Sequence, residues 1–324
     1  MKNNSEAVVS AISSPKLSFV FEGCSWGCIY YLGVYKAILG RYSAEELRVA
    51  RFGGSSSGTL AALGATLGKT VEECMEVYSE LAHCGELFGV FGLMSVFHEI
   101  VLRRWLPKGG DQHLVLNGRL FVNVTRFVAV SDVLSDWTSN DDIIDAMHAS
   151  MHIPFYMSYC KNVRGAMGLD GGLSANIFQI DDDSFTVSAA TRKGDVHPRV
   201  LVSAAECFAP PSTERKEAIF LEGTSAVFPT APDAESRMQR AEDRRTRSAS
   251  QSLVKKGMTQ LLRYALCTAF WTARVLEVRP WTYASVAGLV TASCLYPRQA
   301  WALAHQCFPR GGMGIGLVCT RCTK

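Results

Sequence analysis

The sequence lacks a surplus of charge of either sign. Its 324 residues carry 33 lysines and arginines against 30 aspartates and glutamates, a net charge of +3. Because nucleic-acid-binding domains usually carry a clear basic surplus, this balance predicts no nucleic-acid partner. The 48% content of hydrophobic residues instead fits a globular protein with a sizeable core.

The sequence also lacks a long apolar run near its C-terminus. The uncharged stretch 281–296 lies between Pro280 and Pro297. A membrane-spanning helix needs about 20 apolar residues, so this stretch is too short to span a bilayer. We expect it either to lie at a lipid surface, as an interfacial or hairpin segment, or to pack as core helices onto the rest of the protein. The sequence favours neither alternative.

Features of a secreted protein are missing as well. Residues 1–15 contain one lysine and only a broken apolar run, which is untypical of a secretory signal. The eleven cysteines, an odd number at irregular spacings, argue against a disulfide framework. We therefore expect a cytoplasmic protein. The glycosylation pattern Asn123-Val124-Thr125 is interpreted as a chance match.

Strand-like and helix-like segments alternate along the first two thirds of the chain. Apolar, β-prone runs predict strands at 16–21, 47–52, 119–128 and 184–190. Helical spacing predicts helices over 28–42, 58–68, 70–84 and 140–154. This alternation is typical of a parallel sheet covered by helices on both faces, so the predicted fold class is α/β.

Composition divides the chain into four regions. We expect a disordered tail over 1–15 and a catalytic α/β domain over 16–209. A charged linker or helix is expected over 210–257, because arginines, lysines and glutamates cluster there. The region 258–324 is apolar and bears tryptophans, and we expect a helical extension that associates with lipid or packs on the catalytic domain.

Ser56 is the centre of a G-x-S-x-G frame completed by Gly54 and Gly58. A serine hydroxyl becomes a nucleophile when a sharp strand-to-helix turn exposes it beside a base. Here a β-prone run precedes the frame and a small-residue helix follows it, which argues against a flexible linker. The context predicts that Ser56 is a nucleophile.

Asp170 is the candidate base. It ends a short apolar run and precedes Gly171 and Gly172, and glycines beside an aspartate leave room for a serine to approach it. An ordinary Asp-Gly turn accounts for the same residues, and taken alone it is the favoured interpretation.

The loop between the first strand and the first helix reads "EGCSWGC". Its backbone N–H groups at Gly23, Cys24 and Ser25 precede a helix, and helix N-termini stabilise negative charge. Such a loop is suited to forming an oxyanion hole for the tetrahedral intermediate of acyl transfer.

Three stretches in this order and spacing, "FEGCSWGCIYYLGVYKAI", "FGGSSSGTLAA" and "LDGGLSANIF", resemble the patatin-like phospholipases. The resemblance is greatest to the animal-type branch that contains adipose triglyceride lipase and adiponutrin. It implies a three-layer fold with a mostly parallel central sheet flanked by helices. It also implies a Ser–Asp dyad, with Ser56 as nucleophile and Asp170 as base, and no histidine, cofactor or metal.

The resemblance covers roughly Leu17 to Ala205. It implies hydrolysis of fatty-acyl esters of glycerolipids, of the triacylglycerol lipase or phospholipase A type, through an acyl-enzyme. The substrate would be a glycerolipid or phospholipid met at a membrane or lipid-droplet surface. A transacylase using the same acyl-enzyme, and a lipid-surface scaffold that has lost turnover, are alternatives.

The loop departs from the family pattern where Ser25 and Cys28 replace glycines. If Ser25 must take a positive φ, the conformation costs about 1 kcal/mol. We expect an altered but working oxyanion hole.

A Ser–Asp–His triad is the rival mechanism, because Ser56, Asp170 and His197 follow the chain order of α/β-hydrolases. His152, beside Pro154, is expected to have a packing role near the site.

Metal sites are not predicted. Cys319 and Cys322 have no second C-x-x-C partner, and the run 181–183 of three aspartates is interpreted as a polar turn.

Overall fold

The computed structural model describes residues 17–88, 94–126, 130–153, 162–174, 177–203, 206–207 and 210–228. All of these belong to the first of two compact units, residues 1–267. The predicted N-terminal tail, most of the charged region 210–257 and the predicted helical extension 258–324 lie outside the described residues.

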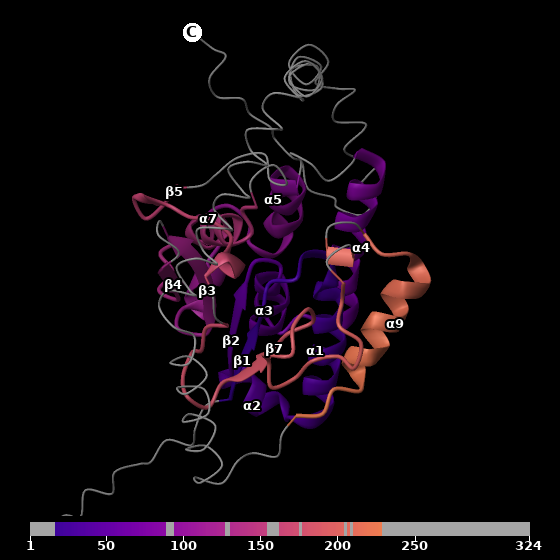
Figure 1. Ribbon diagram of the computed structural model, residues 1–324. Coiled ribbons are helices and arrows are strands. Elements are labelled where there is room, and N and C mark those ends of the chain that lie inside the picture. Colours follow the sequence, from indigo (N-terminus) through magenta and orange to yellow (C-terminus); the bar gives the residue numbers. More distant parts are fainter. Residues whose placement is uncertain are drawn as a thin grey trace, which may run out of the picture. The chain divides into compact units, whose positions relative to one another are not determined.

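A five-stranded sheet in the order β4-β3-β2-β1-β7 forms the centre of the unit (Figure 1). Its strands are β1 (Ser18–Phe21), β2 (Arg51–Ser55), β3 (Leu120–Arg126), β4 (Val130–Leu134) and β7 (Phe185–Val187). Strands β3, β2, β1 and β7 are mutually parallel, and only β4 pairs in the antiparallel direction. A separate hairpin joins β5 (Asn162–Val163) to β6 (Ala166–Met167).

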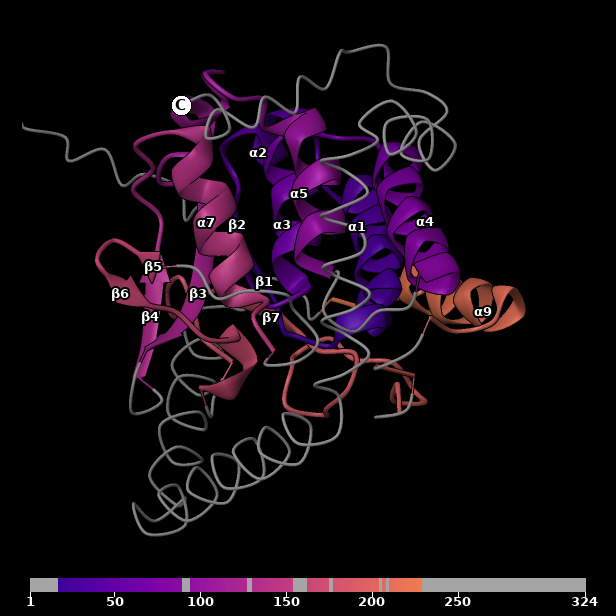
Figure 2. The same cartoon turned by 90° about the horizontal axis from the view of Figure 1, so that it is seen from above.

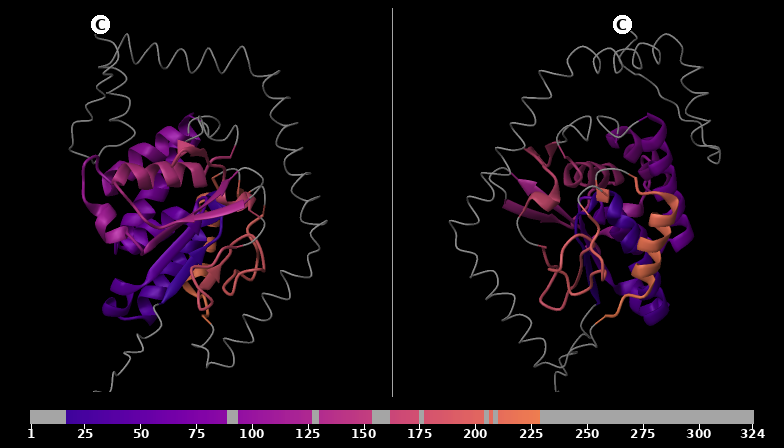
Figure 3. Two further views of the ribbon diagram at one scale, coloured as in Figure 1. Left: turned by 90° about the vertical axis from the view of Figure 1, so that its left-hand side faces the viewer. Right: turned by 45° about the vertical axis from the view of Figure 1, so that its right-hand side comes forward.

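Helices cover the sheet, so the predicted class, a mixed α/β domain with a mostly parallel sheet flanked by helices, is confirmed. The main helices are α1 (Ile29–Arg41), α3 (Gly58–Thr66), α4 (Val71–Phe88), α5 (Met94–Trp105) and α7 (Asn140–Ser150). Figure 2 shows α3, α5 and α7 side by side along the strands, and Figure 3 shows the domain from two further directions. Shorter elements are η1 (Ser25–Cys28), α2 (Ala44–Val49), α6 (Gln112–Leu116), η3 (Gly171–Leu173) and α9 (Thr213–Thr224).

The core is centred on Phe19 of β1. The parallel register places Phe19 beside Phe52 of β2 and Phe185 of β7, with ring centroids 5.5 and 5.6 Å apart. Phe228, which follows α9, meets Phe19 edge-on at 5.9 Å. These aromatic contacts bury large apolar area between the strands and the helices.

Helix α9 packs directly on α1. The two backbones approach so closely that a Cβ added to Gly33 would lie 2.1 Å from the carbonyl oxygen of Phe220. A Cβ added to Gly223 would lie 2.3 Å from the carbonyl oxygen of Tyr30. Only glycine allows the two backbones to approach this closely. Helix α9, which lies within the region 210–257 predicted as charged linker or helix, therefore packs against α1 of the α/β domain.

The strand predicted at 47–52 is wrong over its first residues. Helix α2 occupies Ala44–Val49, and β2 begins only at Arg51. The cause is a capping box: the Ser43 hydroxyl accepts a hydrogen bond from the Glu46 backbone N–H, and the Glu46 carboxylate accepts one from the Ser43 backbone N–H. Thr70 and Glu73 form a second capping box, at the start of α4.

Candidate active site

Ser56 stands in the sharp turn between β2 and α3. Its φ is 51°, a left-handed conformation that costs a non-glycine residue about 1 kcal/mol or more. The flanking glycines allow close backbone contact on both sides. A Cβ on Gly54 would lie 2.4 Å from the backbone nitrogen of Thr59, and one on Gly58 would lie 2.3 Å from the carbonyl oxygen of Phe21.

The Ser56 hydroxyl donates a hydrogen bond to Oδ2 of Asp170 at 2.6 Å. The other carboxylate oxygen accepts from the backbone N–H of Gly172 at 2.8 Å, and both side chains are buried. The direct contact leaves no place for an imidazole between them, as a Ser–Asp–His triad would require. His197, the triad candidate, instead has its Nδ1 3.1 Å from the Pro198 carbonyl oxygen.

Asn123 of β3 fixes the loop that carries Asp170. It is fully buried, and its Nδ2 donates to the carbonyl oxygen of Gly171 at 2.9 Å and to the Ser174 hydroxyl at 3.0 Å. The same amide lies 3.1 Å from the hydroxyl of Ser55, the residue before the nucleophile. Asn123 therefore ties the strand end before Ser56 to the turn after Asp170, and its burial agrees with the interpretation of the glycosylation pattern as chance.

The C-terminal end of α7 and the residues just after it make further hydrogen bonds that position Ser56 and Asp170. The Ser56 backbone N–H donates to the Ser150 hydroxyl at 2.9 Å, and that hydroxyl donates to the Asn123 carbonyl oxygen at 2.6 Å. The carbonyl oxygen of His152 accepts from the Asp170 backbone N–H at 3.1 Å. Sequence analysis missed the positioning roles of Asn123 and Ser150, because buried polar residues carry no motif that links them to a distant turn.

The loop predicted as the oxyanion hole lies against the nucleophile. A Cβ on Gly23 would lie 2.8 Å from the Cβ of Ser56, so the backbone there runs directly past the serine. Ser25 has a φ of 49°, which meets the condition for strain stated above.

The three predicted amides are not equivalent. The Cys24 N–H donates to the Ser57 hydroxyl at 3.3 Å. Within the described part of the chain, no hydrogen bond occupies the backbone N–H of Gly23, Ser25 or Ser57. The residue after the nucleophile commonly supplies an N–H donor to the oxyanion hole. The backbone N–H of Ser57 is therefore a third candidate donor beside those of Gly23 and Ser25, and sequence analysis missed it.

Burial raises the pKa of the Asp170 carboxyl to about 6, although the hydrogen bonds from Ser56 and the Gly172 N–H oppose this rise. A carboxylate with a raised pKa is a stronger base than one in water, and it remains ionised at neutral pH. Burial also lowers the pKa of His98 to about 3, with His148 adding to the effect, so His98 is neutral above that pH.

Activity that depends on ionised Asp170 should therefore fall about tenfold per pH unit below pH 6, because only the carboxylate accepts the proton of Ser56. The measurement is the pH dependence of kcat/KM on a soluble ester. His197→Ala should keep this acid limb and most of the activity. Loss of the limb in that variant would assign it to the histidine.

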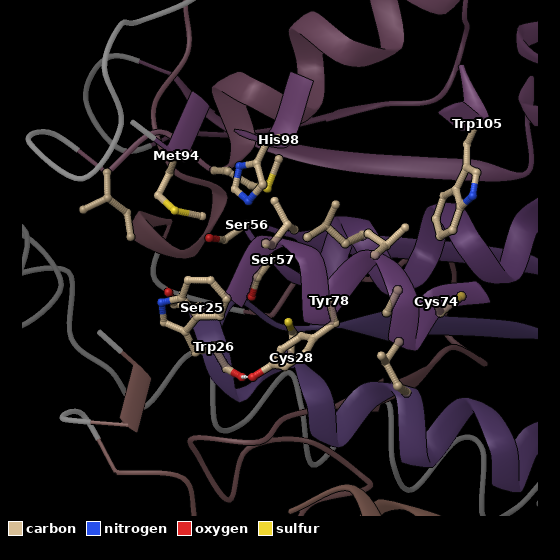
Figure 4. Close-up of a pocket in the computed structure, with 17 residues that line it drawn as sticks. Ser25, Trp26, Cys28, Ser56, Ser57, Cys74, Tyr78, Met94, His98 and Trp105 are labelled. Atoms are coloured by element: carbon tan, nitrogen blue, oxygen red, sulfur yellow. Dashed lines mark hydrogen bonds between the residues drawn. The ribbon is translucent and has the colours of Figure 1, made fainter. Parts of the chain in front are cut away.

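An apolar pocket of about 50 Å³ opens at Ser56 (Figure 4). One wall is the face of α4 formed by Cys74, Val77, Tyr78 and Leu81. The spacing of these residues, three or four apart, places them on one side of the helix. Ser25 and Trp26 of η1, Leu60 and Ala61 of α3, and Met94, His98 and Trp105 of α5 complete much of the rest.

Two further expectations concern metals and membranes. The aspartate run 181–183 is a polar turn, in which Asp181 pairs with Arg51 and accepts from the Ser184 hydroxyl. Among the described residues, no group of three metal-ligating side chains comes together. No helix in that part of the chain combines the length and apolarity needed to cross a bilayer. Cys319, Cys322 and the stretch 281–296 lie outside the described residues.

Two human proteins are among the relatives that comparison with known proteins gives. Human 1-acylglycerol-3-phosphate O-acyltransferase PNPLA3 is 30% identical over 194 residues, which are 56% of this chain and 39% of that protein. Human omega-hydroxyceramide transacylase is 26% identical over 191 residues, 56% of this chain and 35% of that protein. The chain thus spans less than half the length of either relative.

Among solved structures, VipD from Legionella pneumophila is similar with a TM-score of 0.41 and 12% identity, covering 71% of this chain and 67% of that one. The family model of the patatin-like phospholipases matches residues 19–180, which include most of β1, the Ser56 turn and Asp170. The chain therefore belongs to the patatin-like phospholipase family.

Proposed function

We propose that the protein hydrolyses fatty-acyl esters of glycerolipids, as a triacylglycerol lipase or a phospholipase A, through a dyad of Ser56 and Asp170. The observation that carries the proposal is the 2.6 Å hydrogen bond between the two side chains at the opening of an apolar pocket. A buried carboxylate with its pKa raised to about 6 supplies the base that a serine nucleophile needs.

The reaction proceeds in two steps. The Ser56 oxygen attacks the ester carbonyl carbon while its proton passes to Oδ2 of Asp170, and the amides of Gly23, Ser25 and Ser57 stabilise the oxyanion. The C–O bond breaks, and the leaving alcohol takes the proton from Asp170. A water molecule then gives its proton to Asp170 and attacks the acyl-enzyme, which releases the fatty acid and returns the proton to Ser56.

The apolar lining supports a lipid substrate. Helices α3, α4 and α5 turn mostly aliphatic and aromatic side chains toward the pocket, which suits an acyl chain better than a polar group. Acyl chains are not free in water, so the enzyme would work at a membrane or lipid-droplet surface as a peripheral cytoplasmic protein.

A fluorophosphonate probe, which labels activated serines, tests the proposal. Wild type should be labelled, and Ser56→Ala should lose the labelling, because no other serine among the described residues that line the pocket has a carboxylate at hydrogen-bond distance. Turnover on triacylglycerol, phosphatidylcholine and lysophospholipid then identifies the substrate. A folded wild type that resists the probe would favour a lipid-surface scaffold without turnover.

Acyl transfer is the second candidate, because the names of both relatives above describe acyl transfer. The same acyl-enzyme would serve, with an alcohol in place of water in the second step. The measurement is the ratio of esterified product to free fatty acid when 1-acylglycerol-3-phosphate is added. Product formation exceeding hydrolysis would make the protein a transacylase.

A further inference from the structure

We propose that His98 determines substrate specificity by binding a small hydroxyl-bearing group next to the ester bond that reacts at Ser56. The inference rests on the proposed function, because it assumes that an ester reacts there. It adds which esters react fastest: those that carry a hydroxymethyl-sized group on the acyl side or the alcohol side. Neither the dyad nor the family determines this preference.

His98 lies on the buried face of α5 and lines the pocket. Met94, one turn before it, and Trp105, two turns after it, line the same pocket, and Val101 on this face is buried. Figure 4 shows the imidazole extending from α5 toward Ser56. A polar ring therefore occupies a position at which the helical pattern predicts an apolar side chain.

The imidazole has no hydrogen-bond partner among the described residues. His98 is 8% exposed, its Nδ1 is buried, and neither ring nitrogen forms a hydrogen bond within that part of the chain. A buried polar group of this kind destabilises the folded protein unless a ligand or a water molecule supplies the missing bond.

Two other polar side chains of the pocket already have partners. The Ser56 hydroxyl donates to Asp170 at 2.6 Å, and the Tyr78 hydroxyl donates to the carbonyl oxygen of Trp26 at 3.0 Å. His98 thus offers the pocket a hydrogen-bonding group that the described residues do not use.

The charge and the size of the site indicate a hydroxyl group. Burial, with His148 adding to the effect, lowers the pKa of His98 to about 3, so the ring is neutral at physiological pH and does not attract an anion as a cation would. A neutral imidazole has one N–H donor and one acceptor nitrogen, and a hydroxyl matches both. A volume of about 50 Å³ holds about two water-sized groups, since a water molecule takes about 30 Å³ in the liquid. A hydroxymethyl group has this size.

The test uses pairs of short esters in which a hydroxyl replaces a terminal methyl group. On the acyl side the pair is p-nitrophenyl glycolate and p-nitrophenyl propionate, and on the alcohol side it is 2-hydroxyethyl butyrate and propyl butyrate. For wild type, kcat/KM corrected for alkaline hydrolysis should be about tenfold higher for the hydroxyl member of one pair, because the methyl member leaves the imidazole without a partner. The pair that shows the preference identifies the side of the ester that enters the pocket.

His98→Leu should abolish the preference, so that kcat/KM for the hydroxyl member falls about tenfold relative to the methyl member. His98→Gln keeps a donor and an acceptor in its amide and should retain part of the preference. Titration with the fluorophosphonate probe counts the folded, reactive enzyme in each preparation, which separates a change in specificity from misfolding.

His113→Leu is the matched control. His113 also has a buried Nδ1 without a hydrogen-bond partner in the described part of the chain, but it lies on α6 and does not line the pocket. This variant should keep the wild-type preference whatever its effect on stability. Equal ratios in wild type and His98→Leu for both pairs would overturn the inference, whereas turnover of the methyl members would leave the proposed function standing. If folded wild type hydrolysed none of the four esters and the probe failed to label Ser56, both would fall.

Discussion

The Asp170→Asn variant is expected to lose at least about a thousandfold in kcat while gaining stability. An amide cannot accept the proton of Ser56, so the nucleophile loses its base. The geometry is preserved, because the amide oxygen can accept from the Gly172 N–H and the amide nitrogen can donate to the Ser56 hydroxyl. The measurement is turnover of a soluble ester together with probe labelling.

The gain in stability follows from the raised pKa. Folding raises the pKa of Asp170 from 3.8 to about 6, so the folded state binds its proton more tightly, and the free energy of unfolding falls as pH rises through this range. The rise of the pKa from 3.8 to about 6 means that the ionised carboxylate lowers the free energy of unfolding by about 3 kcal/mol at pH 8. Asp170→Asn should recover much of this by urea unfolding at pH 8, and little of it at pH 4.

Ser56→Ala is the control for this result. It removes the nucleophile but leaves the buried carboxylate, which then lacks the hydrogen bond of the hydroxyl. It should be inactive without being more stable. Equal stability of wild type and Asp170→Asn at pH 8 would contradict the assignment of a buried, ionised base to this position.

The Asn123→Leu variant is expected to lose about 3 to 5 kcal/mol of stability and about a hundredfold in kcat of the folded fraction. Leucine has similar volume but leaves the Gly171 carbonyl and the Ser174 hydroxyl with fewer partners in a buried site. It also removes the side-chain oxygen that accepts from the exposed Ser131 hydroxyl at 2.5 Å. With these bonds gone, the Asp170 turn is no longer held at the distance that proton transfer requires.

Asn140→Leu is the matched control. Asn140 is an equally buried asparagine that donates to the Pro107 carbonyl at 2.9 Å and accepts from the His113 N–H at 2.9 Å, away from the serine. The Asn140→Leu variant should lose a similar amount of free energy of unfolding, but its kcat per probe-labelled enzyme molecule should be unchanged. Equal loss of kcat in both variants would show that Asn123 acts through general stability. Urea unfolding and titration with the fluorophosphonate probe separate the two effects.

The sequence determined which residues form the local elements of the site. Glycines at 54 and 58 around a serine, between a β-prone run and a small-residue helix, predict the turn because such a backbone tolerates no side chain there. The alternation of strands and helices predicted the fold class, because hydrophobic periodicity is a local property of the sequence. It failed at Leu47–Val49, where a capping box outweighed β-propensity.

Only the tertiary structure decided which of these elements meet. The hydrogen bond from Ser56 to Asp170 spans 114 residues, and the Asn123 network joins β2, β3 and the turn after Asp170, so no local pattern specifies either. The same holds for the raised pKa of Asp170, which depends on burial by distant segments. The apolar pocket likewise depends on how α3, α4 and α5 pack, and packing is set by the whole set of buried contacts.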